Sequence, residues 1–187
     1  FEDDGYLIIE DFYSADDVEV LRQEMHNIVE DMDLSDNPKS VFITGDKQVV
    51  GDDYFLTSGD KIRAFFEEGA FDDKGNLVKD RHLSINKVGH ALHTLNPLYK
   101  KFTFSNRIQA IARSLELKNP IVPQSMYIFK QPGIGGAVIP HRDSTYLYTE
   151  PTSVIGAWIP LEDCTLENGC LWFIPGSHKS IDLKANI

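Results

Sequence analysis

Cysteine, methionine and tryptophan are scarce in this chain, and acidic residues outnumber basic ones. The 187 residues include only 2 cysteines, 3 methionines and 2 tryptophans. Such sparse cysteine use argues against a disulfide-built scaffold, so we expect Cys164 and Cys170 to be free thiols, although their spacing would also allow a bridge across a turn. With 18 Lys and Arg against 29 Asp and Glu, the formal net charge is -11, which argues against nucleic acid as a partner.

Long apolar runs are also missing. A membrane-spanning helix needs about 20 consecutive apolar residues, and no such stretch is present. No signal or transit peptide is recognisable, so we expect a soluble, cytoplasmic protein without a membrane partner, although an address upstream of Phe1 would be invisible. The composition, 42% hydrophobic and 25% charged, is that of an ordinary globular protein. We predict one domain over residues 1–187 that is incomplete at both ends.

Hydrophobic spacing places helices in the first two thirds of the chain and strands in the last third. Ser14 precedes a helical pattern of apolar residues that runs from Val18 to Met32. The other expected elements are a strand at 5–12, a helix from Ser58 or Asp60 to Phe66, a turn at Gly75, helices that begin after Asn96 and Ser105, and strands at 125–130, 146–148, 154–163 and 168–178. This order predicts an α+β fold in which N-terminal helices buttress one face of a β-sandwich.

His141 and Asp143 stand at the spacing of a metal-binding pair. On a β-strand alternate side chains point the same way, so the two would project together while Arg142 faces the other side. A face of two histidines and one carboxylate leaves three positions open on six-coordinate Fe(II), enough for a bidentate oxo-acid and dioxygen. The triplet alone occurs by chance in roughly one chain in a few, so its context must carry the interpretation.

A competing metal site would use His90 and His93. On a helix, two histidines three positions apart share a face, and a nearby carboxylate would complete a site. No acid follows within one helical turn, so we favour the pair around Arg142.

The surrounding sequence is far more specific than the triplet. Nearly the whole chain, from DGYLII at residues 4–9 to NGCLWFIPGSH at residues 168–178, resembles the phytanoyl-CoA dioxygenase family. The resemblance is greatest to the branch of phytanoyl-CoA dioxygenase domain-containing proteins. The resemblance implies an oxidoreductase, a non-haem Fe(II)- and 2-oxoglutarate-dependent dioxygenase on a double-stranded β-helix, the jelly-roll of the cupins. It further implies hydroxylation of an unidentified small-molecule or acyl substrate by dioxygen, with release of succinate and carbon dioxide.

The resemblance also assigns roles to individual residues. His141 and Asp143 match the family's metal ligands and would form the catalytic centre, while Lys87, Met126 and Trp158 fall where the family contacts 2-oxoglutarate. A cation near a dicarboxylate agrees with the chemistry of charge-assisted hydrogen bonds. The prime substrate and the oligomeric state are not readable from the sequence.

The family's pattern continues with a second histidine and then an arginine that pairs with 2-oxoglutarate. After Asp143 this sequence has one histidine, His178, and no arginine, so we expect the C-terminal strands of the jelly-roll to be missing. His178 is a candidate substitute ligand. Three hypotheses therefore stay open: part of a longer hydroxylase, a truncated and inactive module that acts by binding or regulation, and a metal-binding cupin with non-oxidative chemistry. A histidine followed about ten residues later by an arginine, beyond Ile187, would favour the first.

Overall fold

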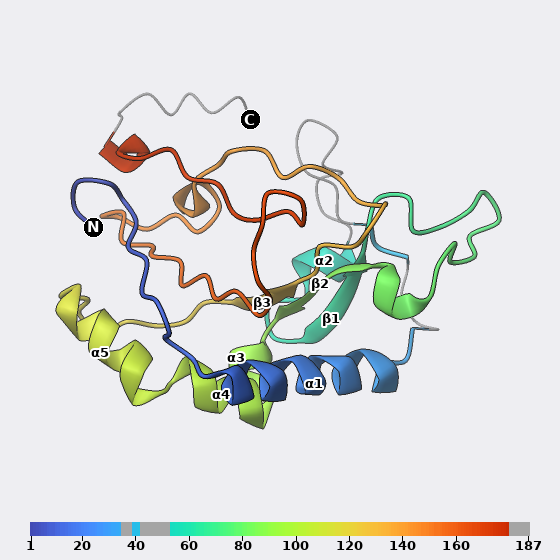
Figure 1. The fold of residues 1–187 in the computed structure, drawn as a ribbon, viewed down its shortest axis with the longest axis horizontal. Coiled ribbons are helices and arrows are strands. Elements are labelled where there is room, and N and C mark those ends of the chain that lie inside the picture. The colour runs from blue at the N-terminus through green and yellow to red at the C-terminus, as the bar shows by residue number, and fades with distance from the viewer. Residues whose placement is uncertain (35–38, 42–52, 180–187) are drawn as a thin grey trace. The chain divides into compact units, whose positions relative to one another are not determined.

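The computed structural model describes residues 1–34, 39–41 and 53–179 (Figure 1). Its chain divides into two compact units, one built from residues 20–136 and the other from residues 1–19 together with those from 137 onward. The described residues form an α+β structure with one antiparallel sheet. The elements are α1 (Ala15–Asp31), α2 (Asp53–Leu56), β1 (Ile62–Phe66), η1 (Arg81–Leu83), β2 (Ile85–His90), α3 (Leu92–Leu95), α4 (Pro97–Thr103), α5 (Asn106–Ser114), β3 (Ser125–Ile128), η2 (Asp143–Thr145) and η3 (Ser177–Lys179), where η denotes a 3₁₀ helix.

Helix α1 begins where its capping residues require. The backbone N–H of Asp17 donates to Ser14 Oγ at 3.1 Å, and Asp17 Oδ2 accepts the backbone N–H of Ser14 at 3.2 Å. This reciprocal pair satisfies two amides that a helix start leaves without partners. Leu21, Met25 and Val29 follow at helical spacing and are buried. The helix predicted after Ser14 is therefore confirmed.

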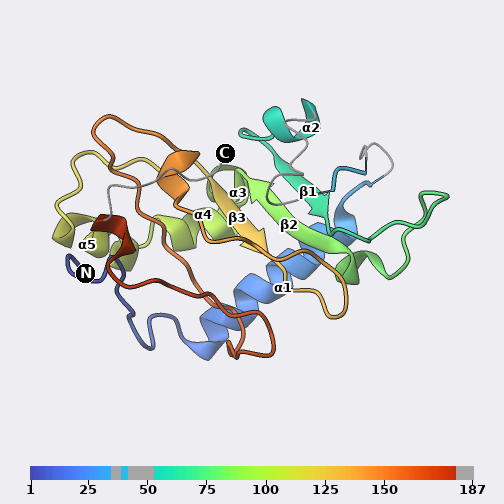
Figure 2. The same ribbon diagram turned by 90° about the horizontal axis from the view of Figure 1, so that it is seen from above.

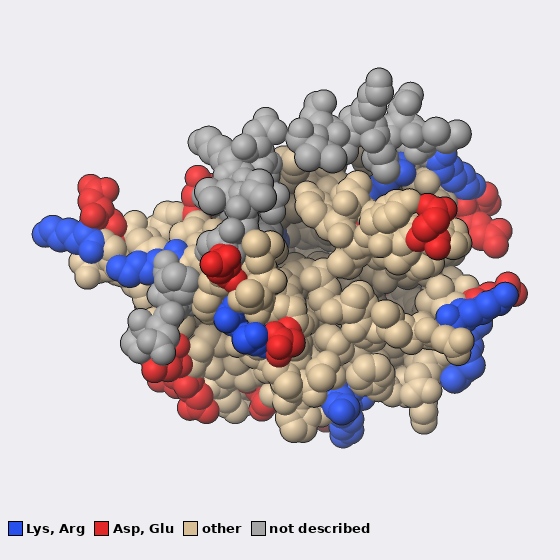
Figure 3. All heavy atoms as spheres, turned by 180° about the vertical axis from the view of Figure 1, so that it is seen from behind, with Lys and Arg blue, Asp and Glu red and all other residues tan. Residues whose placement is uncertain are grey.

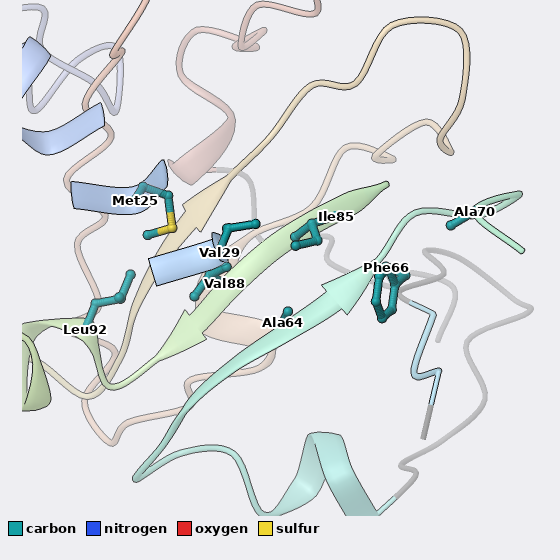
Figure 4. Close-up of a cluster of buried hydrophobic side chains, with 8 residues drawn as sticks. All are labelled: Met25, Val29, Ala64, Phe66, Ala70, Ile85, Val88 and Leu92. Carbon is teal, nitrogen blue, oxygen red and sulfur yellow. The ribbon is translucent and has the colours of Figure 1, made fainter. Parts of the chain in front are cut away.

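The sheet of residues 20–136 has the strand order β1-β2-β3, and each neighbouring pair is antiparallel. Ala64 pairs with Val88, and Val88 pairs with Tyr127, so these three residues face the same side. Helix α1 covers this side (Figure 2). Figure 4 shows Met25 and Val29 of α1 directed at the strands in a core of eight buried residues, namely Met25, Val29, Ala64, Phe66, Ala70, Ile85, Val88 and Leu92.

The opposite side of the sheet carries Lys87. This residue pairs with Phe65 on β1 and with Ile128 on β3, one position along from the pairs around Val88. Because successive side chains on a strand alternate between faces, Lys87 points away from the side that α1 covers. The two faces of this small sheet therefore differ in chemistry, with an apolar core on one and a buried lysine on the other.

The helix predicted to run to Phe66 is wrong, because that segment forms β1. Phe66 lies in the core beside Phe71, whereas Phe65 packs against Tyr54 and Phe55 of α2, with ring centroids 5.5 Å apart in both pairs. A strand places two consecutive aromatic rings on opposite faces and buries both. Pairing with β2 outweighed the local helical pattern.

The predicted helices near residues 97 and 105 are confirmed. Asn96 Oδ1 accepts the first backbone amides of α4, and Ser105 Oγ accepts the N–H of Ile108 in α5. The predicted turn around Gly75 is confirmed too, with a φ of 78° that glycine adopts without strain.

The strands predicted at 5–12, 146–148, 154–163 and 168–178 are wrong for the described residues, which hold strands only at β1, β2 and β3. A strand needs a neighbour that takes its backbone N–H and C=O groups. Alternating apolar residues do not supply that neighbour by themselves. The described sheet therefore does not confirm a jelly-roll.

Two further predictions, on the cysteines and on membrane-spanning helices, can be compared with the described residues. Cys164 and Cys170 are free thiols, as predicted. Among the described helices, none combines the length and the apolar composition needed to cross a membrane. On the face drawn in Figure 3, acidic and basic side chains are interspersed among neutral ones.

Candidate functional site

His141 and Asp143 lie next to each other, as the spacing predicted. Nε2 of His141 is 3.4 Å from Oδ1 of Asp143, and both side chains are partly exposed. The other ring nitrogen, Nδ1, lies 2.9 Å from the carbonyl oxygen of Ile139. A carbonyl only accepts, so Nδ1 carries a hydrogen, and in the neutral ring Nε2 is the nitrogen whose lone pair is available to a metal. A histidine that binds a metal is held in this way by a hydrogen bond from its second nitrogen.

The pair is formed by a turn rather than by a strand. Asp143 opens the 3₁₀ helix η2, whose last residue, Thr145, donates from its backbone N–H to the carbonyl oxygen of Arg142 at 3.1 Å. The Arg142 side chain donates to the carbonyl oxygen of Ser177. The expectation that His141 and Asp143 meet is correct, but the reason given for it, strand alternation, is wrong.

The geometry of this pair suits a shared cation. Two ligands about 2.1 Å from one metal, at an angle of roughly 90–110°, are about 3.0–3.4 Å apart. The observed separation of 3.4 Å between Nε2 and Oδ1 falls at the upper end of that range. An imidazole nitrogen and a carboxylate oxygen are also the donors of a facial triad on Fe(II). The turn therefore presents two donor atoms of the kinds found in such a triad.

The described residues do not bring a third ligand to the pair, since they contain no group of three or more His, Cys, Asp or Glu that could hold a metal. His178 is engaged elsewhere. Its Nε2 donates to the carbonyl oxygen of Glu2 at 3.0 Å, and its ring packs against Gly5. His178, which the sequence left open as a substitute ligand, is therefore not placed beside His141 and Asp143 by the described contacts.

Lys87 is a buried lysine with an altered pKa. Burial removes water from its ammonium group and lowers its pKa from 10.5 to about 7, an effect that Glu67 opposes and Lys130 reinforces. Glu67 is buried as well, and burial raises the pKa of its carboxyl group. Asn86 Nδ2 donates to Glu67 Oε2 at 2.9 Å. A lysine in these surroundings would gain a proton when an anionic carboxylate approaches.

Met126 lies on the same sheet face as Lys87. The register pairs Gly89 with Met126 and Lys87 with Ile128, and residues two apart on a strand share a face. A Cβ atom at Gly89 would lie 3.1 Å from Cγ of Met126, so the glycine makes room for this thioether. The structure thus brings together Lys87 and Met126, two of the three residues expected near 2-oxoglutarate.

Trp158 belongs to the same unit as His141 and Asp143, whereas Lys87 and Met126 belong to the other. It lies outside any strand and is half exposed.

Glu67 was not identified from the sequence as a neighbour of Lys87. Glu67 directly follows β1, and it lies near Lys87 because residues 62–66 form a strand and not the predicted helix.

His90 and His93 act as buried anchors within residues 20–136. Nδ1 of His90 lies 2.8 Å from Oγ of Ser58, and Nδ1 of His93 lies 2.8 Å from Oγ of Ser125. The first histidine ends β2 and the second belongs to α3, so they do not share a helix face. Burial lowers the pKa of His90 to about 4. The competing prediction of a metal site on one helix face is therefore wrong.

Comparison with known proteins places the chain in a family. The phytanoyl-CoA dioxygenase domain-containing protein 1 of Danio rerio is 54% identical over 183 residues, which cover 95% of this chain and 63% of that protein. A phytanoyl-CoA dioxygenase of Arabidopsis thaliana is 53% identical over 180 residues, with 96% of the chain and 63% of that protein covered. The phytanoyl-CoA dioxygenase domain-containing protein 1 of Bos taurus is 52% identical over 183 residues.

The chain spans 63% of the length of these relatives, slightly less than two thirds. The family model described as phytanoyl-CoA dioxygenase (PhyH) matches residues 1–186, almost the entire sequence. The identities to the three relatives are 52–54%. The matched range includes the sheet, the 3₁₀ turn at Asp143 and the five site residues predicted from the sequence, namely Lys87, Met126, His141, Asp143 and Trp158. The chain therefore belongs to the phytanoyl-CoA dioxygenase family.

Proposed function

We propose that the protein to which this chain belongs is a non-haem Fe(II)- and 2-oxoglutarate-dependent dioxygenase that hydroxylates a small-molecule or acyl substrate. The single observation that carries the proposal is the arrangement of His141 Nε2 and Asp143 Oδ1, 3.4 Å apart, with the imidazole tautomer fixed by Ile139. Family membership supports the same chemistry. We further propose that residues 1–187 belong to one catalytic domain of the cupin-like jelly-roll type.

His141 and Asp143 would hold the iron. Bound Fe(II) supplies the coupled oxidation in which dioxygen converts 2-oxoglutarate to succinate and carbon dioxide and hydroxylates a C–H bond of the substrate. The lone pair of His141 Nε2 and the charge of Asp143 Oδ1 are the protein's contribution at this point. The hydrogen bond to Ile139 keeps the ring from turning its protonated nitrogen toward the metal.

Lys87 and Met126 would bind the cosubstrate. The ammonium group of Lys87 offers a charge-assisted hydrogen bond to a carboxylate, and its pKa of about 7 would rise when that anion binds. Met126 offers an apolar, adaptable surface on the same sheet face. Trp158 would provide a further apolar contact.

The proposal is tested by anaerobic titration of the protein with Fe(II) and 2-oxoglutarate. Formation of the complex is followed by its metal-to-ligand charge-transfer absorption, and turnover is followed by succinate release after oxygen is admitted. We expect His141→Ala to abolish the absorption band. His178→Ala is the matched control, because this exposed histidine contacts the backbone of Glu2 and should leave binding unchanged.

Two outcomes would contradict the proposal. If His90→Gln lost the charge-transfer band and His141→Ala kept it, the metal site would have to be assigned to the buried histidines instead. A full-length protein that binds neither Fe(II) nor 2-oxoglutarate would favour the alternative of an inactive module that acts by binding or regulation.

A further inference from the structure

The two carboxylate oxygens of Asp143 have different neighbours. Oδ1 lies 3.4 Å from His141 Nε2, on the side proposed to face the metal. Oδ2 faces the backbone of Gly156, where an added Cβ atom would lie only 3.3 Å from it. That separation is shorter than ordinary van der Waals contact between a methyl group and an oxygen. Gly156 therefore gives the carboxylate space that any other residue would reduce.

The need for glycine at this position is steric and not conformational. Gly156 is absent from the glycines with a φ in the left-handed region, a set that includes Gly133, Gly135, Gly169 and Gly176. Its backbone is therefore open to an L-residue, and the only penalty for a side chain would come from what the side chain meets. In the structure, what it meets is Asp143 Oδ2.

A shift of Oδ2 would be transmitted directly to Oδ1. The carboxylate is planar and rigid, so an atom that displaces one oxygen turns the group about its bond to Cβ. This rotation would carry Oδ1 out of its place beside His141 Nε2. A misalignment of this kind at a metal ligand weakens binding even though both ligands are still present.

We propose that Gly156 is a positioning residue for the metal-binding carboxylate: its missing side chain lets Asp143 keep Oδ1 beside His141. The inference rests on the proposed function, since it assumes that the pair binds a metal. It adds a residue whose proposed effect is exerted through Asp143. A glycine two positions before Trp158 thereby has a role distinct from that of the tryptophan.

The experiment compares Gly156→Ala with Gly59→Ala. Gly59 is the matched control, because an added Cβ there meets nothing within 4 Å and its φ is likewise outside the left-handed region. Mn(II) serves as a redox-stable probe, and electron paramagnetic resonance counts the free ion during a titration of the protein. We expect Gly156→Ala to raise the Kd for Mn(II) about tenfold, in the range seen when the support of a metal ligand is removed. Gly59→Ala should leave the Kd unchanged.

A metal-free measurement separates the role in positioning from a general packing role. The melting temperature is determined for Gly156→Ala in the parent chain and in an Asp143→Ala background. We expect a decrease of roughly 2 °C in the parent and none in the background that lacks the carboxylate. An equal decrease in both would show that the added methyl group acts on something other than Asp143, and would overturn the inference.

The titration distinguishes failure of the inference from failure of the proposed function. If the parent binds Mn(II) and Gly156→Ala binds it equally well, the positioning role is refuted while the metal pair stands. The titration is done on the full-length protein: if neither the full-length parent nor any variant of it binds Mn(II), the metal pair is refuted and the proposed role of Gly156 is refuted with it.

Discussion

The side-chain amide of Asn96 donates from Nδ2 to Oε1 of Glu24 at 2.6 Å, and this bond joins the start of α4 to the middle of α1. Oδ1 of the same amide accepts the backbone N–H groups of Leu98 and Tyr99, each at 3.0 Å. One side chain therefore caps a helix and links it to another. Only a group with a donor at one end and an acceptor at the other can do both.

Asn96→Asp should separate these two roles. Aspartate still caps α4, but it offers no donor to Glu24 and places a second carboxylate against the first. We expect the free energy of unfolding to fall by about 2 kcal/mol, measured by urea denaturation near pH 7. Asn27→Asp is the control, because the exposed Asn27 only accepts a hydrogen bond from Gln23. Addition of Glu24→Gln should restore part of the lost stability. If Asn96→Asp is as stable as the parent, the hydrogen bond between Asn96 and Glu24 does not contribute to the free energy of unfolding.

Arg81 closes the C-terminal end of α1, which has no basic residue in its own last turn. Its guanidinium donates to the carbonyl oxygens of Val29, Glu30 and Met32 at 3.3, 3.1 and 3.2 Å. We expect Arg81→Met to lower the free energy of unfolding by about 2 kcal/mol, because these carbonyls lose their donor. Lys118→Met, at an exposed lysine, removes a charge of the same sign and should have little effect. Equal effects of the two changes in urea denaturation would contradict the capping role.

The burial of His90 predicts sensitivity to acid. Burial lowers its pKa to about 4 in the folded chain, whereas an exposed histidine titrates near 6.5. Between these pH values the unfolded state binds more protons than the folded state, so the free energy of unfolding falls as the pH decreases from about 6.5 to about 4. Below that window the contribution is constant. We expect a loss on the order of 2 kcal/mol, detected by urea denaturation at pH 7 and pH 4.5.

His90→Gln provides the test of that assignment. Glutamine can still donate to Ser58 Oγ but does not titrate. The variant should lose stability less steeply with acid than the parent does, although His93, whose pKa burial also lowers, will contribute a slope of its own. An unchanged slope in the variant would assign the acid sensitivity to other groups.

Lys87 predicts a pH dependence on the alkaline side. Its pKa is about 7 in the folded chain, and an exposed lysine titrates near 10.5. Between these values the unfolded lysine holds a proton that the folded one has released, so stability rises with pH across this window. Lys87→Met should remove a rise on the order of 2 kcal/mol between pH 7 and pH 10. Lys118→Met should retain it, and the same rise in Lys87→Met would contradict the assignment.

Local signals in the sequence were sufficient for the helices that begin at a polar cap. Ser14, Asn96 and Ser105 each accept a backbone N–H of the first turn, and those contacts lie within a few residues along the chain. The segment around Phe65 and Phe66 had no such cap, and its aromatic residues fitted either structure. Its identity as a strand depended on β2, about twenty residues away.

The proposed metal site shows the same division. The juxtaposition of His141 and Asp143 was predicted from strand alternation, but in the structure a 3₁₀ turn produces it. Neither the 3₁₀ turn that joins them nor the approach of Gly156 to Asp143 Oδ2 could be read from the triplet. The buried Glu67 beside Asn86 was likewise invisible, because its position follows from the pairing of β1 with β2.

The sequence alone determined the helix starts, the free thiols, the pairing of one imidazole with one carboxylate, and the family to which the chain belongs. These properties depend on short-range hydrogen bonds or on the residues themselves. Tertiary structure decided which apolar segments became strands, which face of the sheet buries Lys87, and which oxygen of Asp143 faces His141. A strand or an oriented carboxylate is defined by its neighbours in space, and residues distant in sequence supply those neighbours.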